Sequence, residues 1–418
     1  MGRTDIARVV GRRVWDSRGR PTVEAEVTLA GGAVGRAIAP AGASTGSGEA
    51  VDRRDGGPAF GGYDVRGAVA AVNGEIAAAL AGLDATDQET ADEALVALDG
   101  TGNKSRLGGN AMIATSLAVA HAAAAGERVP LWQYLAGTER PASMPRPEIQ
   151  LFGGGAHAGR RVDVQDFMIV ATGAATFDAA LDMTAEVYRA AGKLLAQQGK
   201  LAGVADEGGY WPAFDTNEEA LGLAVAAIEA AGFRPGDEVA ISLDIAASDF
   251  GRDGRYTLAR EGRVLDTEGM IAMLLGWLER YPIRWIEDPL AEDDEAGLIA
   301  FTRAAPGVRV VGDDYLVTNA GRVRHAAAAG ACNTALIKPN QAGTLTETRA
   351  AFDAARGARW QTIVSARSGE SEDVSVTHLA VGWGADMLKV GSFTRSERMA
   401  KWNEGLRIAE ALGNPPLA

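Results

Sequence analysis

Three acidic residues and two lysines follow short apolar runs in the second half of this 418-residue chain. The acids are Asp244, Glu287 and Asp313, and the lysines are Lys338 and Lys389. Carboxylates with no thiolate or histidine cluster nearby suit Mg²⁺ rather than structural zinc. A dication beside a lysine lowers the pKa of its ammonium group, which makes a neutral amine available as a general base. These residues predict a metal site with a basic lysine next to it.

An acid and an anion-binding group are also available in the sequence. Glu207 is followed by two glycines, which allow the backbone to approach a ligand closely. Arg367 and Ser368 are typical of an anion clamp, because a planar guanidinium can hold a phosphate or carboxylate at two points. Metal, base, acid and anion site together predict proton abstraction next to a carboxylate, with the enediolate stabilised by Mg²⁺.

The apolar runs before these residues predict the elements that position them. Six runs each end on a charged residue: 239–243 before Asp244, 283–286 before Glu287, 308–312 before Asp313, 334–337 before Lys338, 362–366 before Arg367 and 386–388 before Lys389. The spacing is typical of βα units in a parallel sheet. One charged residue after a strand is often only a solvated loop residue. Six in succession favour a (β/α)₈-type barrel, whose C-terminal strand ends converge on one pocket.

The first third of the chain has a different organisation. Segments 6–15 and 23–39 are rich in β-branched residues, and a turn at Ala30-Gly31-Gly32 divides the second into two strands. Three Ala-rich segments with apolar residues at helical spacing follow, near 63–82, 86–98 and 110–126. Strands followed by packed helices predict an α+β cap domain.

The length of the chain exceeds what one hydrophobic core usually organises, so we expect two domains. The predicted cap domain is residues 1–140, and the predicted barrel domain, which carries the active site, is residues 141–418. The fold class is therefore α/β, with an N-terminal α+β cap followed by a (β/α)₈-type barrel.

Composition argues against several classes of protein. The net charge of −14 disfavours a nucleic-acid binder, which concentrates Lys and Arg. The apolar fraction of 47% disfavours disorder. The weakly polar run 111–125 is shorter than the roughly 20 residues of a membrane span, so we expect a buried helix there. The first residues lack the apolar core of a secretory signal, and the lone Cys332 cannot form an internal disulfide. Both features favour a cytoplasmic protein.

Several longer segments, in order along nearly the whole chain, carry further information. They are DSRGRPTVEAEV from Asp16, GASTGS from Gly42, DEGGY from Asp206, SLDIAAS from Ser242, IEDP from Ile286, GDD from Gly312, IKPNQAGTLTET from Ile337, RSGESED from Arg367 and RSERMAKWN from Arg395. In this order the segments resemble the enolase family. A lysine base working with Mg²⁺ is a known pattern of the enolase superfamily.

The resemblance implies a cap domain on a barrel, Mg²⁺ as cofactor, and usually a homodimer or a larger homo-oligomer. It also implies roles for the pocket residues: Asp244, Glu287 and Asp313 as metal ligands, Lys338 as base, Glu207 as acid, Asp166 at a further catalytic position, and Arg367, Ser368, Lys389, His157 and Gln165 as substrate-binding residues. The expected partner is a small phosphorylated or phosphonylated carboxylate, with no nucleic acid and no membrane.

Four positions depart from the family pattern. Ala41 stands where the family has a serine that helps bind a second Mg²⁺, and Ala366 stands where it has a histidine. Asp166 replaces a glutamate, and Gly153 replaces an asparagine. Shortening a carboxylate moves it by about 1 Å, which can cost on the order of 10²-fold in rate.

The smaller residues Ala41, Gly153 and Ala366 would all enlarge the pocket, although the Ala41 carbonyl could still reach a second metal. We therefore expect a specialised paralogue. The predicted function is formation of an enolate from 2-phosphoglycerate or a related phospho- or phosphono-carboxylate, with conversion of 2-phosphoglycerate to phosphoenolpyruvate and water as the reference reaction.

Two alternatives stay open. One is an enzyme like the carboxyphosphonoenolpyruvate synthases of phosphinate biosynthesis, which would join a phosphonoformyl group from a cytidylyl donor to an enolpyruvate unit. The other is a non-catalytic binding protein. The intact Lys338, Lys389 and Glu207 argue against the second alternative.

Overall fold

A three-stranded antiparallel sheet begins the chain in the computed structural model, which describes residues 2–137 and 142–417. Its strands are β1 (Ile6–Trp15), β2 (Pro21–Leu29) and β3 (Val34–Ile38), in the order β1-β2-β3. The predicted turn joins β2 to β3, where the Gly32 amide donates to the Leu29 carbonyl. Gly32 has a φ of 88°, a conformation that glycine adopts without steric cost.

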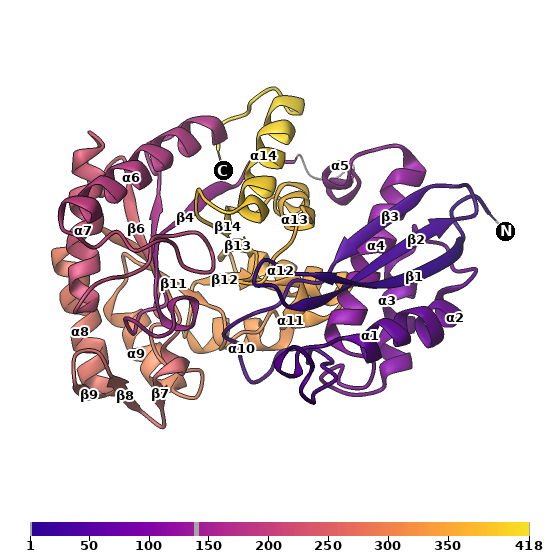
Figure 1. Ribbon diagram of the computed structural model, residues 1–418, viewed down its shortest axis with the longest axis horizontal. Coiled ribbons are helices and arrows are strands. Elements are labelled where there is room, and N and C mark those ends of the chain that lie inside the picture. Colours follow the sequence, from indigo (N-terminus) through magenta and orange to yellow (C-terminus); the bar gives the residue numbers. More distant parts are fainter. Residues whose placement is uncertain (1, 138–141, 418) are drawn as a thin grey trace.

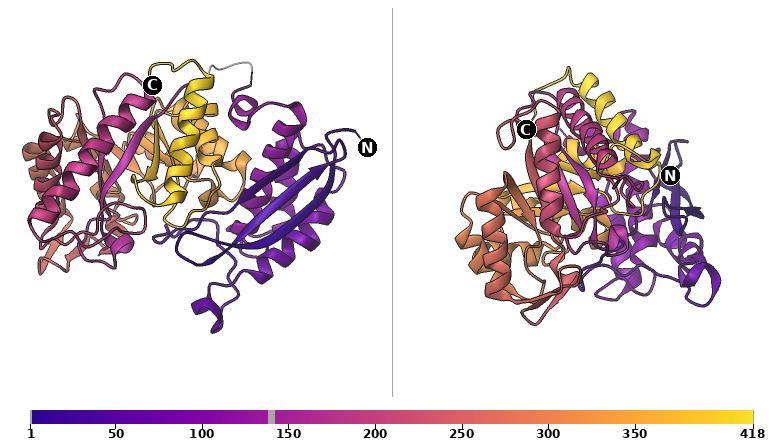
Figure 2. Two further views of the ribbon diagram at one scale, coloured as in Figure 1. Left: turned by 45° about the horizontal axis from the view of Figure 1, so that its top comes forward. Right: turned by 60° about the vertical axis from the view of Figure 1, so that its left-hand side comes forward.

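Helices cover one face of this sheet (Figures 1 and 2). Those that pack on the sheet are α1 (Arg66–Ala71), α2 (Ala77–Leu80) and α4 (Gly109–Glu127), while α3 (Gln88–Asp99) and α5 (Leu131–Ala136) pack against α4. A π-helical turn, Val72–Ile76, joins α1 to α2, so these three pieces form the helix predicted near 63–82. The buried helix predicted at 111–125 is α4, most of whose residues are inaccessible to solvent. Within the described residues, no helix is both long and apolar enough to cross a membrane.

Eight strands in the rest of the described chain form a closed barrel, in the order β10-β11-β12-β13-β14-β4-β5-β6. They are β4 (Arg146–Gly153), β5 (Asp166–Val170), β6 (Ala240–Asp244), β10 (Ile283–Glu287), β11 (Arg309–Gly312), β12 (Thr334–Ile337), β13 (Gln361–Ser365) and β14 (Met387–Gly391). All six apolar runs that precede charged residues in the sequence are among these strands, which confirms that part of the prediction.

Helices surround the barrel on its outside (Figure 1). They are α6 (Phe177–Gln197), α7 (Asn217–Ala230), α8 (Thr267–Arg280), α9 (Glu295–Ala304), α10 (Ala320–Ala329), α12 (Leu345–Gly357), α13 (Ser375–Trp383) and α14 (Ser396–Ala411). The short helix α11 (Pro339–Ala342) lies instead at the mouth of the barrel, where it contacts α4 of the cap. Several of these helices begin at a residue whose side-chain oxygen accepts a hydrogen bond from a backbone amide of the first turn. Thr176 accepts from the Ala179 amide, and Asp294 accepts from the Gly297 amide.

One strand contradicts the expected all-parallel sheet. Strand β5 runs antiparallel to both of its neighbours, β4 and β6. The reason is the short connection at 154–165, which reverses the chain without a crossover helix, whereas parallel neighbours require a long crossover. The helices α6 and α7 then both follow β5 before the chain returns as β6. The reversal puts the first residue of β5, rather than its last, at the mouth of the barrel.

A second small sheet was not predicted. Strands β7 (Gly251–Arg252), β8 (Arg255–Leu258) and β9 (Arg263–Asp266) form an antiparallel sheet after β6. Asp253 and Gly254 join β7 to β8 with φ angles of 49° and 69°. An Asp-Gly pair is a strong hairpin signal, so the sequence did contain evidence for this turn.

The cap packs beside the barrel, and the N-terminus lies at the end of the cap away from it (Figures 1 and 2). An isolated antiparallel bridge between Ala41 and Gly369 ties a cap loop to the loop after β13. Lys104 of the cap donates to Glu347 of α12 at 2.7 Å between Nζ and Oε1. The predicted boundary between residues 140 and 141 lies outside the described residues.

Gly35 of β3 lies directly against α4, and a methyl group there would collide with the Ala122 nitrogen and the Ala118 carbonyl oxygen. We expect Gly35→Ala to lower the free energy of unfolding by at least about 1–3 kcal/mol, because backbone atoms cannot move aside as a flexible side chain can. Urea denaturation measures this difference. Gly222→Ala on the open face of α7 is the control and should not destabilise the protein, because nothing lies within 4 Å of the added methyl group.

Candidate active site

Three carboxylates share one level at the mouth of the barrel. Asp244, the last residue of β6, pairs in register with Glu287 of β10 on one side and with Asp166 of β5 on the other. Asp166 reaches this level only because β5 is reversed. A search for charged residues at strand ends would miss it, since it begins its strand.

A small cavity at this mouth brings together residues from both halves of the chain. Nine predicted site residues are on its wall: His157, Gln165, Glu207, Asp244, Asp313, Lys338, Arg367, Ser368 and Lys389. Ala366 is also on the wall, together with Ala43 and Ser44 of the cap. Asp166 and Glu287 do not line the cavity. Both are buried, and they contact His157 and Lys389, respectively, which do line it.

The two lysines are held by the predicted metal ligands. Lys389 donates to Asp244 at 3.0 Å and to Glu287 at 2.7 Å between Nζ and the carboxylate oxygens. Lys338 donates to Asp313. Burial disfavours the charged form of both lysines, but the surrounding carboxylates outweigh burial and raise the pKa of each above its ordinary value. The lowered lysine pKa expected for a general base is therefore not produced by the protein groups alone and would depend on a bound cation.

The carboxylates respond to the same charges. Burial raises the pKa of Asp244 and of Asp313, but the nearby lysines outweigh it and hold both below their ordinary values. Glu287 differs, because burial and the charge of Asp244 raise its pKa well above the ordinary range. One of its oxygens, Oε1, is buried and accepts no hydrogen bond.

The donor set of the three predicted ligands fits a hard cation. All three are carboxylates at the same end of the barrel, and the unpartnered Glu287 oxygen is available as a ligand. Two other groups of residues in the described chain have donor atoms that all lie within 4.8 Å of one another, whereas the three predicted ligands do not form such a group. These two groups are His157, Asp166 and Glu207, and Asp288, Asp313 and Asp314.

Asp288 is a site residue that the sequence reasoning missed. Its carboxylate accepts from the amides of Asp313 and Asp314 at 2.8 and 2.7 Å, so it fixes the loop that presents Asp313. Asp288 directly follows Glu287 in the IEDP segment and has a φ of 41°, in the left-handed region. The position of Asp288 within the IEDP segment was the feature of the sequence that could have identified it.

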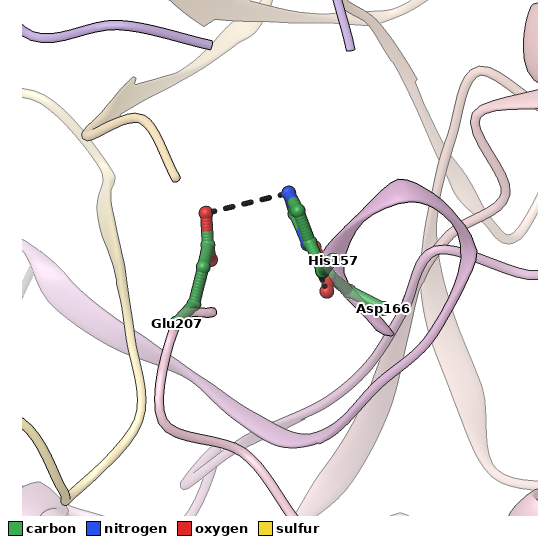
Figure 3. A group of neighbouring side chains, drawn as sticks. All are labelled: His157, Asp166 and Glu207. Carbon is green, nitrogen blue, oxygen red and sulfur yellow. Dashed lines mark hydrogen bonds and ion pairs between the residues drawn. The ribbon is translucent and has the colours of Figure 1, made fainter. Parts of the chain in front are cut away.

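His157 lies between two carboxylates (Figure 3). Its Nδ1 is 2.9 Å from Asp166 Oδ1, and its Nε2 is 3.6 Å from Glu207 Oε1. Burial lowers the pKa of His157, but Asp166 and Glu207 outweigh burial and raise it to about 9. At neutral pH the ring is therefore an imidazolium, which has a proton to donate next to Glu207.

Gln150 of β4 is a second residue that the sequence reasoning missed. Its side-chain amide donates to Asp166 and accepts from the Gly209 amide at 2.8 Å. Gly209 lies two residues after Glu207, so Gln150 links the Glu207 loop to the aspartate that holds His157. Strand β4 also contains Arg146 and Glu148, so a polar residue at position 150 did not stand out in the sequence.

Of the three positions expected to enlarge the pocket, only Ala366 lines the cavity. A side chain at Gly153 would lie 2.6 Å from the Ala205 methyl and 3.3 Å from the Gln150 amide nitrogen, so its space is already filled. Ala41 is not on the cavity wall either. Its carbonyl accepts from Arg18 and from the Gly369 amide, both at 2.9 Å, and is therefore not free to reach a metal as expected. Among these three residues, Ala366 alone borders the cavity, where its small side chain leaves room for a ligand.

Arg367 is anchored more firmly than a free anion clamp. Its guanidinium donates to both oxygens of Glu49 at 2.9 and 3.2 Å, to Asn340 at 3.0 Å and to the Ser44 carbonyl at 2.9 Å. Burial opposes its charge, but Glu49 outweighs burial and raises its pKa. An anion reaching Arg367 would meet its remaining Nε–H or displace the cap loop that carries Ser44 and Glu49.

Comparison with protein families matches both parts of the chain. Residues 6–135 match the family model described as the enolase N-terminal domain. Residues 141–416 match the family model described as the enolase C-terminal TIM barrel domain.

We expect the imidazole resonances of His157 to titrate near pH 9, above the ordinary value of about 6.5. Because the folded pKa is the higher one, the imidazolium stabilises the fold fully below about pH 6.5, and this contribution disappears as the pH rises through 9. NMR titration, with the resonance assigned by its loss in His157→Gln, measures the pKa. Asp166→Asn should lower it, and an unchanged value in that variant would contradict the proposed origin of the shift.

Proposed function

The chain belongs to the enolase family and is an enolase-superfamily enzyme, and on this basis we propose that it forms an enolate from 2-phosphoglycerate or a closely related phospho- or phosphono-carboxylate in a Mg²⁺-dependent reaction. The observation that carries the proposal is the cavity itself. Lys338 and Glu207, a base and an acid from distant parts of the chain, line one cavity together with an arginine and a second lysine.

In the proposed reaction Lys338 removes the proton from the carbon next to the substrate carboxylate, and Glu207 delivers a proton to the departing hydroxyl group. The products are phosphoenolpyruvate and water when 2-phosphoglycerate is the substrate. Burial raises the pKa of Glu207, but His157 and the nearby cationic side chains outweigh burial and hold it below its ordinary value. Glu207 is therefore proposed to relay a proton from the His157 imidazolium, which lies 3.6 Å from its carboxylate. Asp166 holds His157 through Nδ1 and is proposed to act as a positioning residue.

Asp244, Glu287 and Asp313 are the residues that would hold Mg²⁺, which when bound would offset the negative charge that develops on the enolate. Only this one metal site is proposed, since the Ala41 carbonyl is engaged by two donors. Arg367, Ser368, Lys389 and Gln165 are proposed to bind the phosphate and carboxylate of the substrate. Family membership also supports a homo-oligomer, and we retain a cytoplasmic location as part of the proposal.

The test is the rise in ultraviolet absorbance when purified protein receives 2-phosphoglycerate with and without Mg²⁺. We expect Mg²⁺-dependent turnover that Lys338→Ala reduces by about 10²–10⁴-fold, the usual contribution of a positioned base. Lys193→Ala on the exposed side of α6 is the matched control and should leave the rate unchanged. Deuterium exchange of the substrate C–H bond measures proton abstraction separately. Exchange and turnover that both survive in Lys338→Ala would rule out the proposed base.

A second candidate is favoured by Ala366, whose methyl group leaves space on the cavity wall where the family has a histidine. In this reading the protein resembles the carboxyphosphonoenolpyruvate synthases and transfers a phosphonoformyl group from a cytidylyl donor to an enolpyruvate unit, with cytidine monophosphate as the leaving group. If so, 2-phosphoglycerate should bind with little turnover, and phosphorus NMR should show consumption of the cytidylyl phosphonoformate. No consumption with either 2-phosphoglycerate or phosphoenolpyruvate would reject this candidate.

A further inference from the structure

A groove of about 850 Å³ lies at the same end of the barrel as the catalytic cavity. Its wall comes from the cap loop, the β7–β8 hairpin and the segment before it, the loop after β10, and α10. Its size is within the range of about 300–1,000 Å³ that is usual for small-molecule sites. Ser44 joins the two sites, because it lines the catalytic cavity and its hydroxyl contacts Asp249 of the groove at 3.4 Å.

Two arginines are set directly opposite each other in this groove. Arg252 of β7 and Arg255 of β8 are a cross-strand pair, so both side chains project from the same face of the hairpin. The turn at Asp253 and Gly254 fixes this register. Like charges directly opposite in a sheet are destabilising. Both side chains are exposed, and neither has a carboxylate within 4.0 Å among the described residues. On its other side Arg255 lies opposite Asp266 of β9, whose carboxylate accepts from the Gly269 amide at the start of α8. The hairpin therefore places two guanidiniums next to each other, neither of which forms an ion pair among the described residues.

A third arginine completes the positive side of the groove. Arg322 of α10 packs its guanidinium against the backbone at Gly48 and donates only to the Tyr315 carbonyl, at 3.3 Å. Within the described residues it likewise has no carboxylate partner.

The acidic groups of the groove are already engaged by donors of the protein. Glu292 accepts from the Ser47 amide at 3.1 Å, and Asp293 accepts from the Asp253 amide at 3.1 Å. Asp249 contacts the Ser44 hydroxyl, and Arg160 lies 3.9 Å from its carboxylate. The groove therefore has three carboxylates as well as three guanidiniums. The carboxylates are held by neighbouring donors, whereas the three guanidiniums form no ion pair with a carboxylate among the described residues.

We propose that this groove binds a nucleoside phosphate as a second ligand beside the catalytic cavity. Guanidinium groups hold phosphate oxygens at two points, and three of them are available here. Phe250 lines the same groove and is only half-buried, which offers an aromatic face for a flat base. Arg252, Arg255 and Arg322 bind the phosphate, and Phe250 contacts the base. This inference rests on the proposed function in one respect only, namely that the neighbouring cavity is the active site.

Isothermal titration calorimetry of the full chain, without 2-phosphoglycerate, tests the groove directly. The probes are the four nucleoside 5′-monophosphates, the corresponding nucleosides and inorganic phosphate. We expect at least one nucleoside monophosphate to bind more tightly than either inorganic phosphate or its own nucleoside. Arg252→Ala/Arg255→Ala should weaken this binding at least about tenfold, while Arg324→Ala on the same helix as Arg322 should leave it unchanged.

Thermal unfolding provides a second measurement. Since Arg252 and Arg255 repel each other, their replacement should not lower the melting temperature of the free protein. Addition of the nucleotide should raise the melting temperature of the unmodified protein but not that of the double variant. Equal affinity for inorganic phosphate and nucleotides, absence of binding, or binding that is unaffected by the double substitution would each overturn the proposal. Because no turnover is involved, these results do not depend on whether Lys338 acts as a base.

Discussion

Two ammonium groups buried among carboxylates organise the mouth of this barrel. Lys389 lies between Asp244 and Glu287, and Lys338 contacts Asp313. A buried charge is costly unless it is paired and hydrogen-bonded, so each of these side chains requires the others to be in place. Because the partners are on different strands, the electrostatic network can form only when the barrel has closed in the correct register. The charges proposed for catalysis are therefore also a condition for correct packing.

The reversal of β5 adds a second set of charges to the first. It brings Asp166 to the same level as Asp244 and gives His157 a buried carboxylate partner. The result is a histidine with a high pKa that lies close to Glu207. Gln150 stabilises this arrangement from β4 by bonding to Asp166 and to the amide of Gly209. The proton transfer proposed near Glu207 would thus depend on backbone topology as well as on side-chain chemistry.

The cap contributes to the site through its loops. Glu49 and the Ser44 carbonyl hold Arg367, while the backbone bridge from Ala41 to Gly369 fastens the same loop to the barrel. The loop also contacts the groove, since Ser44 reaches Asp249. One cap segment therefore borders both the catalytic cavity and the arginine-lined groove, so a ligand in either place would touch the same loop.

Much of the fold and of the cavity could be predicted because the signals are local. Apolar runs that end on Asp244, Lys338 or Lys389 identify barrel strands. The charged residues after these runs identify the end of the barrel at which the cavity lies. The Ala-rich run of α4 identifies a buried helix. Individual effects of substitution were harder to predict. Gly153 was expected to enlarge the pocket, but Ala205 and Gln150 occupy that space.

The sequence by itself determined which residue types are available for metal binding, acid–base chemistry and anion binding, and in which order their strands occur, because residue type and periodicity are properties of the chain. Only the tertiary structure decided that β5 runs backwards, that Asp166 holds His157, and that Arg252 and Arg255 line a groove with Arg322. These outcomes depend on a short loop, on hydrogen bonds between strands and on contacts between distant segments. Residue spacing does not encode any of them until the barrel closes.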